Sequence, residues 1–185
     1  CDVLFGDKVP SGKLTATMPK SVGQIPLYYN YLNTGRPLKE GKWFTKFTSN
    51  YLDIDNDPLY PFGYGLSYTT FKYGKPTLSS NTMTNNETIS VSVDITNTGN
   101  YDADEIAQMY IRDLAASVSR PVKELKGFER ISIKKGETKT VTFTITPEDL
   151  KFYNQELEYK NEPGEFEVMV GPNSKDVQTL TFTLK

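Results

Sequence analysis

The chain has 185 residues, in which 21 Lys and Arg face 23 Asp and Glu, and its formal net charge is −2. This balance gives no electrostatic reason to expect binding to nucleic acid or to an anionic membrane, and no apolar run is long enough to span a bilayer. The sequence contains no histidine, which excludes Ser-His-Asp and Cys-His nucleophile systems and nearly all zinc sites. We therefore expect neither a metal nor a cofactor.

The single cysteine, Cys1, cannot form an internal disulfide. It would be the lipidated residue if the chain were a mature lipoprotein. Residues 3–5 (VLF), however, are typical of a strand and turn rather than of a polar tether. Residues 1–6 also lack the charged and apolar regions of a signal peptide. We expect that the chain is cut from a longer one.

The first third of the chain has a loop-like sequence. Leu14, Ala16 and Met18 alternate with polar residues, which predicts an edge strand bounded by prolines. Residues 21–57 show no sustained period, and a loop of this length is usually functional or packed on another element. We expect it to form no core of its own. Two alternatives stay open for residues 1–57: partial disorder, or folding back onto the rest of the chain.

Residues 58–69 (PLYPFGYGLSYT) separate this loop-rich part from a strand-rich one. Four aromatic rings, Tyr60, Phe62, Tyr64 and Tyr68, alternate with prolines that fix φ and glycines that allow positive φ. The pattern predicts a segment shaped by turns. It fits either an aromatic loop that fills a small core or a buried joint between two bodies.

From residue 71 onward, apolar and polar residues alternate in short runs. Residues 146–150 (TPEDL) predict a short helical turn, because threonine and proline suit the first positions of a helix. The predicted strands are residues 89–95, 105–112, 125–133, 141–145, 166–170 and 180–184. Such runs predict a mainly β fold, an antiparallel immunoglobulin or fibronectin type III-like β-sandwich preceded by an irregular, loop-rich segment. We expect this sandwich to fold alone, since two sheets supply a core.

Several acidic residues are candidates for a calcium site or a catalytic pair, but their spacing supports neither. Residues 53–57 (DIDND) mimic the start of a calcium loop, but Pro58 and Tyr64 stand where an EF-hand needs glycine and glutamate. We expect an acidic turn. The neighbouring carboxylates at 104–105 and 148–149 lie at a strand start and in a helical cap, so we expect them to be structural. Residues 120–128 fit either a docking surface or a polar strand edge protected by lysines.

Two sets of motifs carry a resemblance to a known family. The first set is residues 6–7 (GD), 10–14 (PSGKL), 19–26 (PKSVGQIP), 33–37 (NTGRP) and 58–69. It resembles the end of the α/β sandwich domain of family 3 glycoside hydrolases, of the bacterial periplasmic β-glucosidase type. The second set is residues 97–99 (NTG), 108–113 (QMYIRD), 119–128 (SRPVKELKGF) and 162–166 (EPGEF). It resembles the fibronectin type III-like domain that follows in the same enzymes.

The resemblance implies a division into residues 1–69, the tail of the α/β sandwich domain with a linker, and residues 70–185, the fibronectin type III-like domain. It also implies a parent that carries a preceding barrel and α/β sandwich, hydrolyses terminal β-linked sugars of oligosaccharides, and is periplasmic or secreted. In that family the nucleophile is a barrel aspartate, and the acid/base is usually a glutamate earlier in the sandwich domain. We therefore expect no catalytic residue in this chain, which would be inactive alone.

The resemblance places residues 33–48 in a domain that helps to wall the active site. Sugar rings stack on aromatic side chains and pair with arginine, so we predict that Arg36, Trp43 and Phe44 lie next to the substrate. The alternative is packing against the missing domains. We assign the rings of residues 60–68 to interdomain packing, not to a sugar platform. A stand-alone carbohydrate-binding module and a homodimerisation module remain alternative functions.

Overall fold

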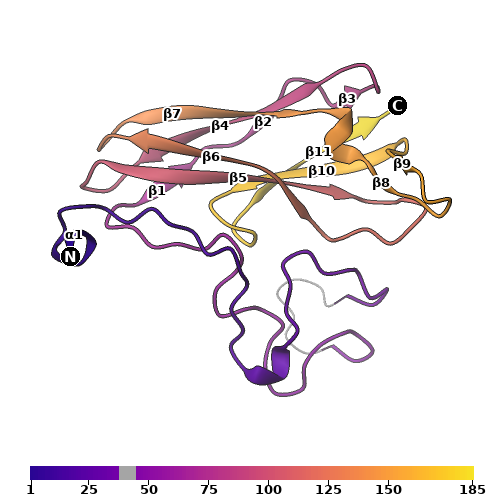
Figure 1. Ribbon diagram of the computed structural model, residues 1–185, viewed down its shortest axis with the longest axis horizontal. Helices are drawn as coiled ribbons and strands as arrows, with labels where there is room; N and C mark the ends of the chain where they lie inside the picture. Colours follow the sequence, from indigo (N-terminus) through magenta and orange to yellow (C-terminus); the bar gives the residue numbers. More distant parts are fainter. Residues whose placement is uncertain (38–44) are drawn as a thin grey trace.

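Two sheets stack face to face in the last two thirds of the chain, and the first third lies along one of them (Figure 1). The computed structural model describes residues 1–37 and 45–185. No helix among these residues is long and apolar enough to cross a membrane. The antiparallel β-sandwich is thus the fold that the alternating runs predicted.

Each sheet is built from strands that are distant in sequence. The first contains β1 (Phe71–Tyr73), β2 (Thr77–Leu78), β4 (Ile89–Asn97) and β7 (Thr138–Ile145), with β4 pairing the other three. The second has the order β3 (Thr82–Met83), β11 (Gln178–Leu184), β10 (Gly164–Gly171), β5 (Ala103–Asp113), β6 (Glu124–Ile133). The remaining elements are the hairpin of β8 (Phe152–Tyr153) and β9 (Tyr159–Lys160), the helix α1 (Asp2–Phe5), and the 3₁₀ helices η1 (Val22–Gln24) and η2 (Pro147–Leu150).

The core lies between the two sheets and follows the predicted alternation. Along β4, residues Val91, Val93 and Ile95 are buried at every second position, and the intervening side chains are more exposed. Facing side chains come from β5, β10 and β11, including the stacked rings of Phe166 and Phe182, whose centroids lie 5.5 Å apart. The six predicted strands are therefore confirmed as β4, β5, β6, β7, β10 and β11. The predicted turn at 146–150 is confirmed as η2.

Two predictions for the first residues are wrong. The run at residues 3–5 lies in α1, not in a strand, and the helix ends at Gly6 in the left-handed conformation with φ 87°. Residues 14–18 form no strand, and the chain bends at residues 15 and 16. Their backbone pairs with residues 60–64 only at Leu14, which bonds Gly63 and Tyr64, and at Met18, which bonds Tyr60. The ladder between these points is broken because Pro61 has no N–H and accepts a turn hydrogen bond from Tyr64.

The outer face of β5, which points away from the core, is covered by the first third of the chain. The amide Nε2 of Gln108 donates to the carbonyl oxygens of Gly63, at 3.1 Å, and Pro172, at 2.8 Å. The hydroxyl of Tyr110 donates to Gln108 Oε1. We call this contact region the seam, and it consists of Tyr29, Phe62, Gly63, Gln108 and Tyr110.

Aromatic rings fill the rest of the seam. The ring of Tyr29 stacks on Phe62 at a centroid distance of 4.2 Å and meets Tyr110 edge-on at 5.9 Å. Tyr110 is fully buried, and this burial, with the nearby Tyr29, raises the pKa of its hydroxyl. Both faces of β5 are therefore buried, one in the core and one in the seam.

A buried ion pair joins the first third of the chain to the sandwich beside the seam. Lys13 Nζ lies 3.1 Å from Glu105 Oε1, and the two side chains are 14% and 6% exposed. The hydroxyl of Tyr73 on β1 donates to the same oxygen at 2.9 Å. Burial and the neighbouring Glu105 raise the pKa of Tyr73, so this hydroxyl stays a donor. Glu105 is thus paired rather than free.

We predict that Gly63→Ala destabilises the chain through the seam. Gly63 has φ +79°, and an added Cβ would lie 2.0 Å from Gln108 Oε1. The strained backbone and the disturbed buried hydrogen bonds together should lower the free energy of unfolding by about 2–4 kcal/mol. Urea denaturation of the 185-residue chain measures this. Gly136→Ala is the matched control, because Gly136 has φ +75° but open space around it. Equal losses for both variants would contradict the role of the seam.

We predict that Lys13 and Glu105 are strongly coupled. Lys13→Met leaves a buried carboxylate without its cation and should cost about 3 kcal/mol of unfolding free energy, whereas combining it with Glu105→Gln should recover part of that loss. A double-mutant cycle by urea denaturation measures the coupling. The control cycle uses Lys20 and Asp55, whose side chains are 32% and 45% exposed, and which should couple by less than about 1 kcal/mol. Additive losses at Lys13 and Glu105 would refute the coupling.

Candidate functional site

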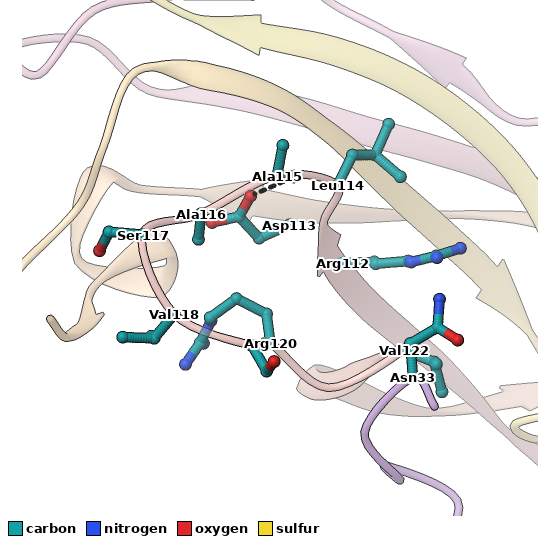
Figure 2. A pocket seen from close by; sticks show the side chains of 11 residues that line it. Asn33, Arg112, Asp113, Leu114, Ala115, Ala116, Ser117, Val118, Arg120 and Val122 are labelled. Atoms are coloured by element: carbon teal, nitrogen blue, oxygen red, sulfur yellow. Dashed lines mark hydrogen bonds between the residues drawn. The ribbon is translucent and has the colours of Figure 1, made fainter. Parts of the chain in front are cut away.

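A cavity of about 370 Å³ lies beside the loop that follows β5 (Figure 2). The loop runs from residue 113 to 120 and returns toward β6. One further residue, Asn33, comes from the first third of the chain. The charged side chains of the lining are Arg112, Asp113 and Arg120. The cavity therefore joins parts of the chain that are far apart in sequence.

Asp113 stands where β5 ends and the loop begins. Its Oδ1 accepts a hydrogen bond from the backbone N–H of Ala115 at 3.1 Å. Its Oδ2 is buried and has no hydrogen-bond partner. Burial raises the pKa of this carboxyl, partly offset by the Ala115 hydrogen bond and by the charge of Arg120. One acceptor atom of Asp113 is therefore buried without a hydrogen-bond partner.

Arg120 stands at the other end of the loop and is held on two sides. Its Nη2 lies 2.7 Å from Glu124 Oε2, and its Cζ lies 4.5 Å from the centre of the Phe152 ring. These contacts fix the guanidinium plane. Its Nε is buried without a partner. Arg120 thus keeps one buried donor without a partner.

The tip of the loop is anchored to the β8–β9 hairpin and the residues that follow it. Glu162 accepts hydrogen bonds from the backbone N–H and the hydroxyl of Ser117, at 2.8 and 2.6 Å. Gln155 Nε2 donates to the carbonyl oxygen of Ser117 at 3.0 Å. The loop is therefore tied down at its tip as well as at its two ends.

Of the predicted substrate-adjacent residues, only Arg36 is described. It is exposed, and its carbonyl oxygen accepts a hydrogen bond from the N–H of Ser49 at 2.9 Å. Trp43 and Phe44 lie outside the described residues. Arg36 does not line the cavity, although Asn33 of the same segment does. The substrate role of these three residues stays a prediction.

The four rings of residues 60–68 make different contacts. Phe62 belongs to the seam, whereas Tyr60 and Tyr64 stack on each other with centroids 4.9 Å apart. The hydroxyl of Tyr68 donates to the carbonyl oxygen of Val3 at 2.6 Å. Tyr60 and Tyr68 are 40% and 47% exposed. Their assignment to interdomain packing stays a prediction.

The acidic turn is held by lysines. The carboxylate of Asp55 accepts a hydrogen bond from Lys20 Nζ at 2.6 Å, and this hydrogen bond lowers the pKa of Asp55. Asp57 pairs with Lys175 at 2.7 Å. Within residues 1–37 and 45–185, no three His, Cys, Asp or Glu side chains are grouped as metal ligands would be. The two carboxylates therefore serve as ion-pair partners.

The neighbouring carboxylates of β5 also have separate structural partners. Asp104 accepts hydrogen bonds from Ser132, at 2.5 Å, and Arg130, at 2.9 Å, and these bonds, that of Ser132 most of all, lower its pKa. Glu105 is committed to Lys13 and Tyr73. The two carboxyls do not face a common space, as an acid/base pair would require.

Residues 120–128 receive the first third of the chain. The N–H of Val122 donates to the carbonyl oxygen of Tyr31 at 3.0 Å, and that of Leu125 to the hydroxyl of Tyr29 at 3.3 Å. Leu32 forms a bridge with Pro121. These contacts favour the docking interpretation of the segment over a bare polar edge.

The sequence pattern did not predict Asp113 or Ser117 as residues of a site. Asp113 ends an apolar run and Ser117 sits in a loop, and neither position has a distinctive spacing. The only available signal was the hydrophobic strand that ends at an acidic residue. Their position beside Arg120 in the lining of one cavity depends on the course of the chain, which no local pattern reveals.

Two family models match the chain in order. The glycosyl hydrolase family 3 C-terminal domain matches residues 1–68, and the fibronectin type III-like domain matches residues 105–174. The chain is 55% identical over 99% of its length to the periplasmic beta-glucosidase of Salmonella typhimurium, and 48% identical over 99% to a putative beta-xylosidase of Formosa agariphila. It makes up 24% and 23% of these two proteins, about a quarter of their length.

A solved structure has the same fold. The crystal structure of the beta-glucosidase from Listeria innocua in complex with glucose superposes with a TM-score of 0.91 at 45% identity. The match covers 99% of this chain and 25% of that one. The chain therefore belongs to glycosyl hydrolase family 3, and it corresponds to the C-terminal module of its β-glucosidase and β-xylosidase relatives.

Proposed function

We propose that the chain is the accessory C-terminal module of a glycosidase that hydrolyses terminal β-linked sugars of oligosaccharides. The observation that carries this proposal is the continuous match: 99% of the chain aligns at 55% identity with a β-glucosidase of which it makes up only 24%. The catalytic carboxyls then lie in the preceding barrel and α/β sandwich domains, which are the partners of this module. The name of the same relative supports a periplasmic or secreted location.

The module works by holding a loop-rich segment in place. Its two parts are residues 1–69 and 70–185, a division supported by the family models that match residues 1–68 and 105–174. Residues 29–32 are fixed on residues 121–125, just before and at the start of β6, which sets the course of the chain toward Arg36. The fibronectin type III-like part then serves as a scaffold, and residues 33–48 border the substrate of the parent enzyme.

The proposal predicts that the full-length enzyme is active and that this chain alone is not. The full-length enzyme should hydrolyse an aryl β-glucoside or an aryl β-xyloside, and the 185-residue chain should release no aryl group from either. Absorbance of the released phenol measures both. Inactivity of the full-length enzyme on both substrates would refute the proposed activity. Hydrolysis by the 185-residue chain that one carboxylate substitution abolishes would refute the accessory role.

We predict that Arg36→Ala in the full-length enzyme raises KM for an oligosaccharide about tenfold and leaves kcat nearly unchanged. A charged hydrogen bond to a sugar hydroxyl stabilises the bound ground state and transition state alike, by about 1.5 kcal/mol. Steady-state kinetics on a disaccharide and a trisaccharide measure the change. Lys72→Ala, at an exposed position of β1, is the control. Unchanged kinetics for Arg36→Ala would remove Arg36 from the substrate site.

A further inference from the structure

Phe47 combines an exposed aromatic ring with an unfavourable backbone conformation. Its side chain is 81% exposed, and its φ is 65°. The left-handed conformation brings Cβ close to the backbone, and it is rare for a bulky residue. No burial of the ring within the described chain offsets this cost. Strained residues of this kind cluster at functional sites, so Phe47 is a candidate for contact with a ligand.

Among the described residues only Leu157 shares both features, with φ 62° and 81% exposure. The turn between β8 and β9 accounts for Leu157. Its N–H donates to the carbonyl oxygen of Asn154 at 3.1 Å, and the side-chain oxygen of Asn154 accepts from the N–H groups of Glu156 and Glu158 at 3.0 and 2.9 Å. Phe47 makes no comparable backbone hydrogen bond with a described residue. Hairpin geometry therefore explains Leu157 but not Phe47.

The turn that carries Phe47 is closed by side-chain and backbone contacts. The hydroxyl of Thr48 donates to the carbonyl oxygen of Thr45 at 2.6 Å. The N–H of Ser49 donates to the carbonyl oxygen of Arg36 at 2.9 Å. Phe47 thus stands two residues from a backbone contact with Arg36. A ring on a backbone that is already ordered loses less conformational entropy when a ligand binds.

The ring of Phe47 and the guanidinium of Arg36 offer the two kinds of contact that a sugar makes. An aromatic face packs on the C–H groups of a pyranose, and a guanidinium donates hydrogen bonds to its hydroxyl groups. Both residues are exposed. The two residues therefore form a small recognition surface at the base of the segment that we propose to border the substrate.

We propose that Phe47 contacts the sugar units of the substrate that lie beyond the scissile bond, and so determines how well the parent enzyme binds oligosaccharides. The inference rests on the proposed function, from which the choice of a sugar follows. The catalytic carboxyls flank the scissile bond, and by that proposal they belong to the preceding domains. A residue of the accessory module then reaches the units further along the substrate.

The test is steady-state kinetics of the full-length enzyme on aryl β-glycosides of glucose and xylose and on cellotriose, laminaritriose and xylotriose. Phe47→Gly should raise KM for the best trisaccharide about five- to tenfold, because the apolar contact with one face of the ring is lost. Its kcat, and its KM for the aryl glycoside, should change by less than about twofold. Phe47→Tyr keeps a ring and should retain the KM of the wild type.

The matched control is Leu157→Gly. It relieves the same backbone conformation at a position of equal exposure, and it should leave every kinetic constant unchanged. A rise in KM for the trisaccharide in this variant as well would mean that the effect does not depend on the ring of Phe47, and would overturn the inference.

Thermal melts of the full-length variants separate contact with the substrate from packing against the preceding domains. Glycine adopts the left-handed conformation without a steric penalty, so Phe47→Gly should not lower Tm. If the ring instead packs against the preceding domains, its removal leaves a cavity at that contact, and Tm should fall by several degrees. Such a fall would assign Phe47 to packing and overturn the inference.

The kinetic outcomes distinguish this inference from the proposed function. If the wild type cleaves an aryl glycoside and Phe47→Gly has an unchanged KM for the trisaccharide, the inference fails and the proposed function stands. The same holds if the wild type cleaves an aryl glycoside but none of the three trisaccharides. Inactivity of the wild type on every substrate would refute the proposed function and this inference with it.

Discussion

The structure depends on the burial of both faces of β5. Its inner face contributes Ala107 and Met109 to the core, and its outer face carries Gln108 and Tyr110, which are 3% and 0% exposed. A strand of a sandwich that is buried on both sides needs a third layer to satisfy its polar atoms. The irregular first third of the chain is that layer. Gly63 supplies a carbonyl oxygen at a point where no side chain would fit.

This constraint explains why a segment without regular structure follows a defined course. Across the described part of residues 21–57, only Gln24 is buried, and it bonds the carbonyl oxygens of Asp55 and Asp57. The segment has no core of its own, as the absence of a hydrophobic period predicted. A few hydrogen bonds of polar side chains and the contacts of the seam hold it in place. The expectation that the sandwich folds alone stays a prediction. The seam argues against it, because removing residues 1–69 would expose Tyr110 and leave Glu105 without Lys13.

The alternating runs predicted the strands well because period 2 directly reports burial on one face. This alternation failed to predict burial where a segment outside the two sheets covers a strand. The run at residues 105–112 predicted a strand, but its period did not show that Gln108 and Tyr110 on the outer face would also be buried. The strand predicted at 14–18 alternates correctly, yet its partner segment turns at Pro61. The cavity was not predicted because its lining residues, Asn33 and residues from 112 to 122, come together through the path of the chain, and the resemblance to a family identified the module rather than this cavity.

The seam and the cavity share the same segment. Tyr29 belongs to the seam, Tyr31 and Leu32 contact residues 121 and 122 just before β6, and Asn33 lines the cavity. Because residues 33–37 continue directly from this docked stretch, the contacts of Tyr31 and Leu32 with residues 121 and 122 also limit where Arg36 can lie.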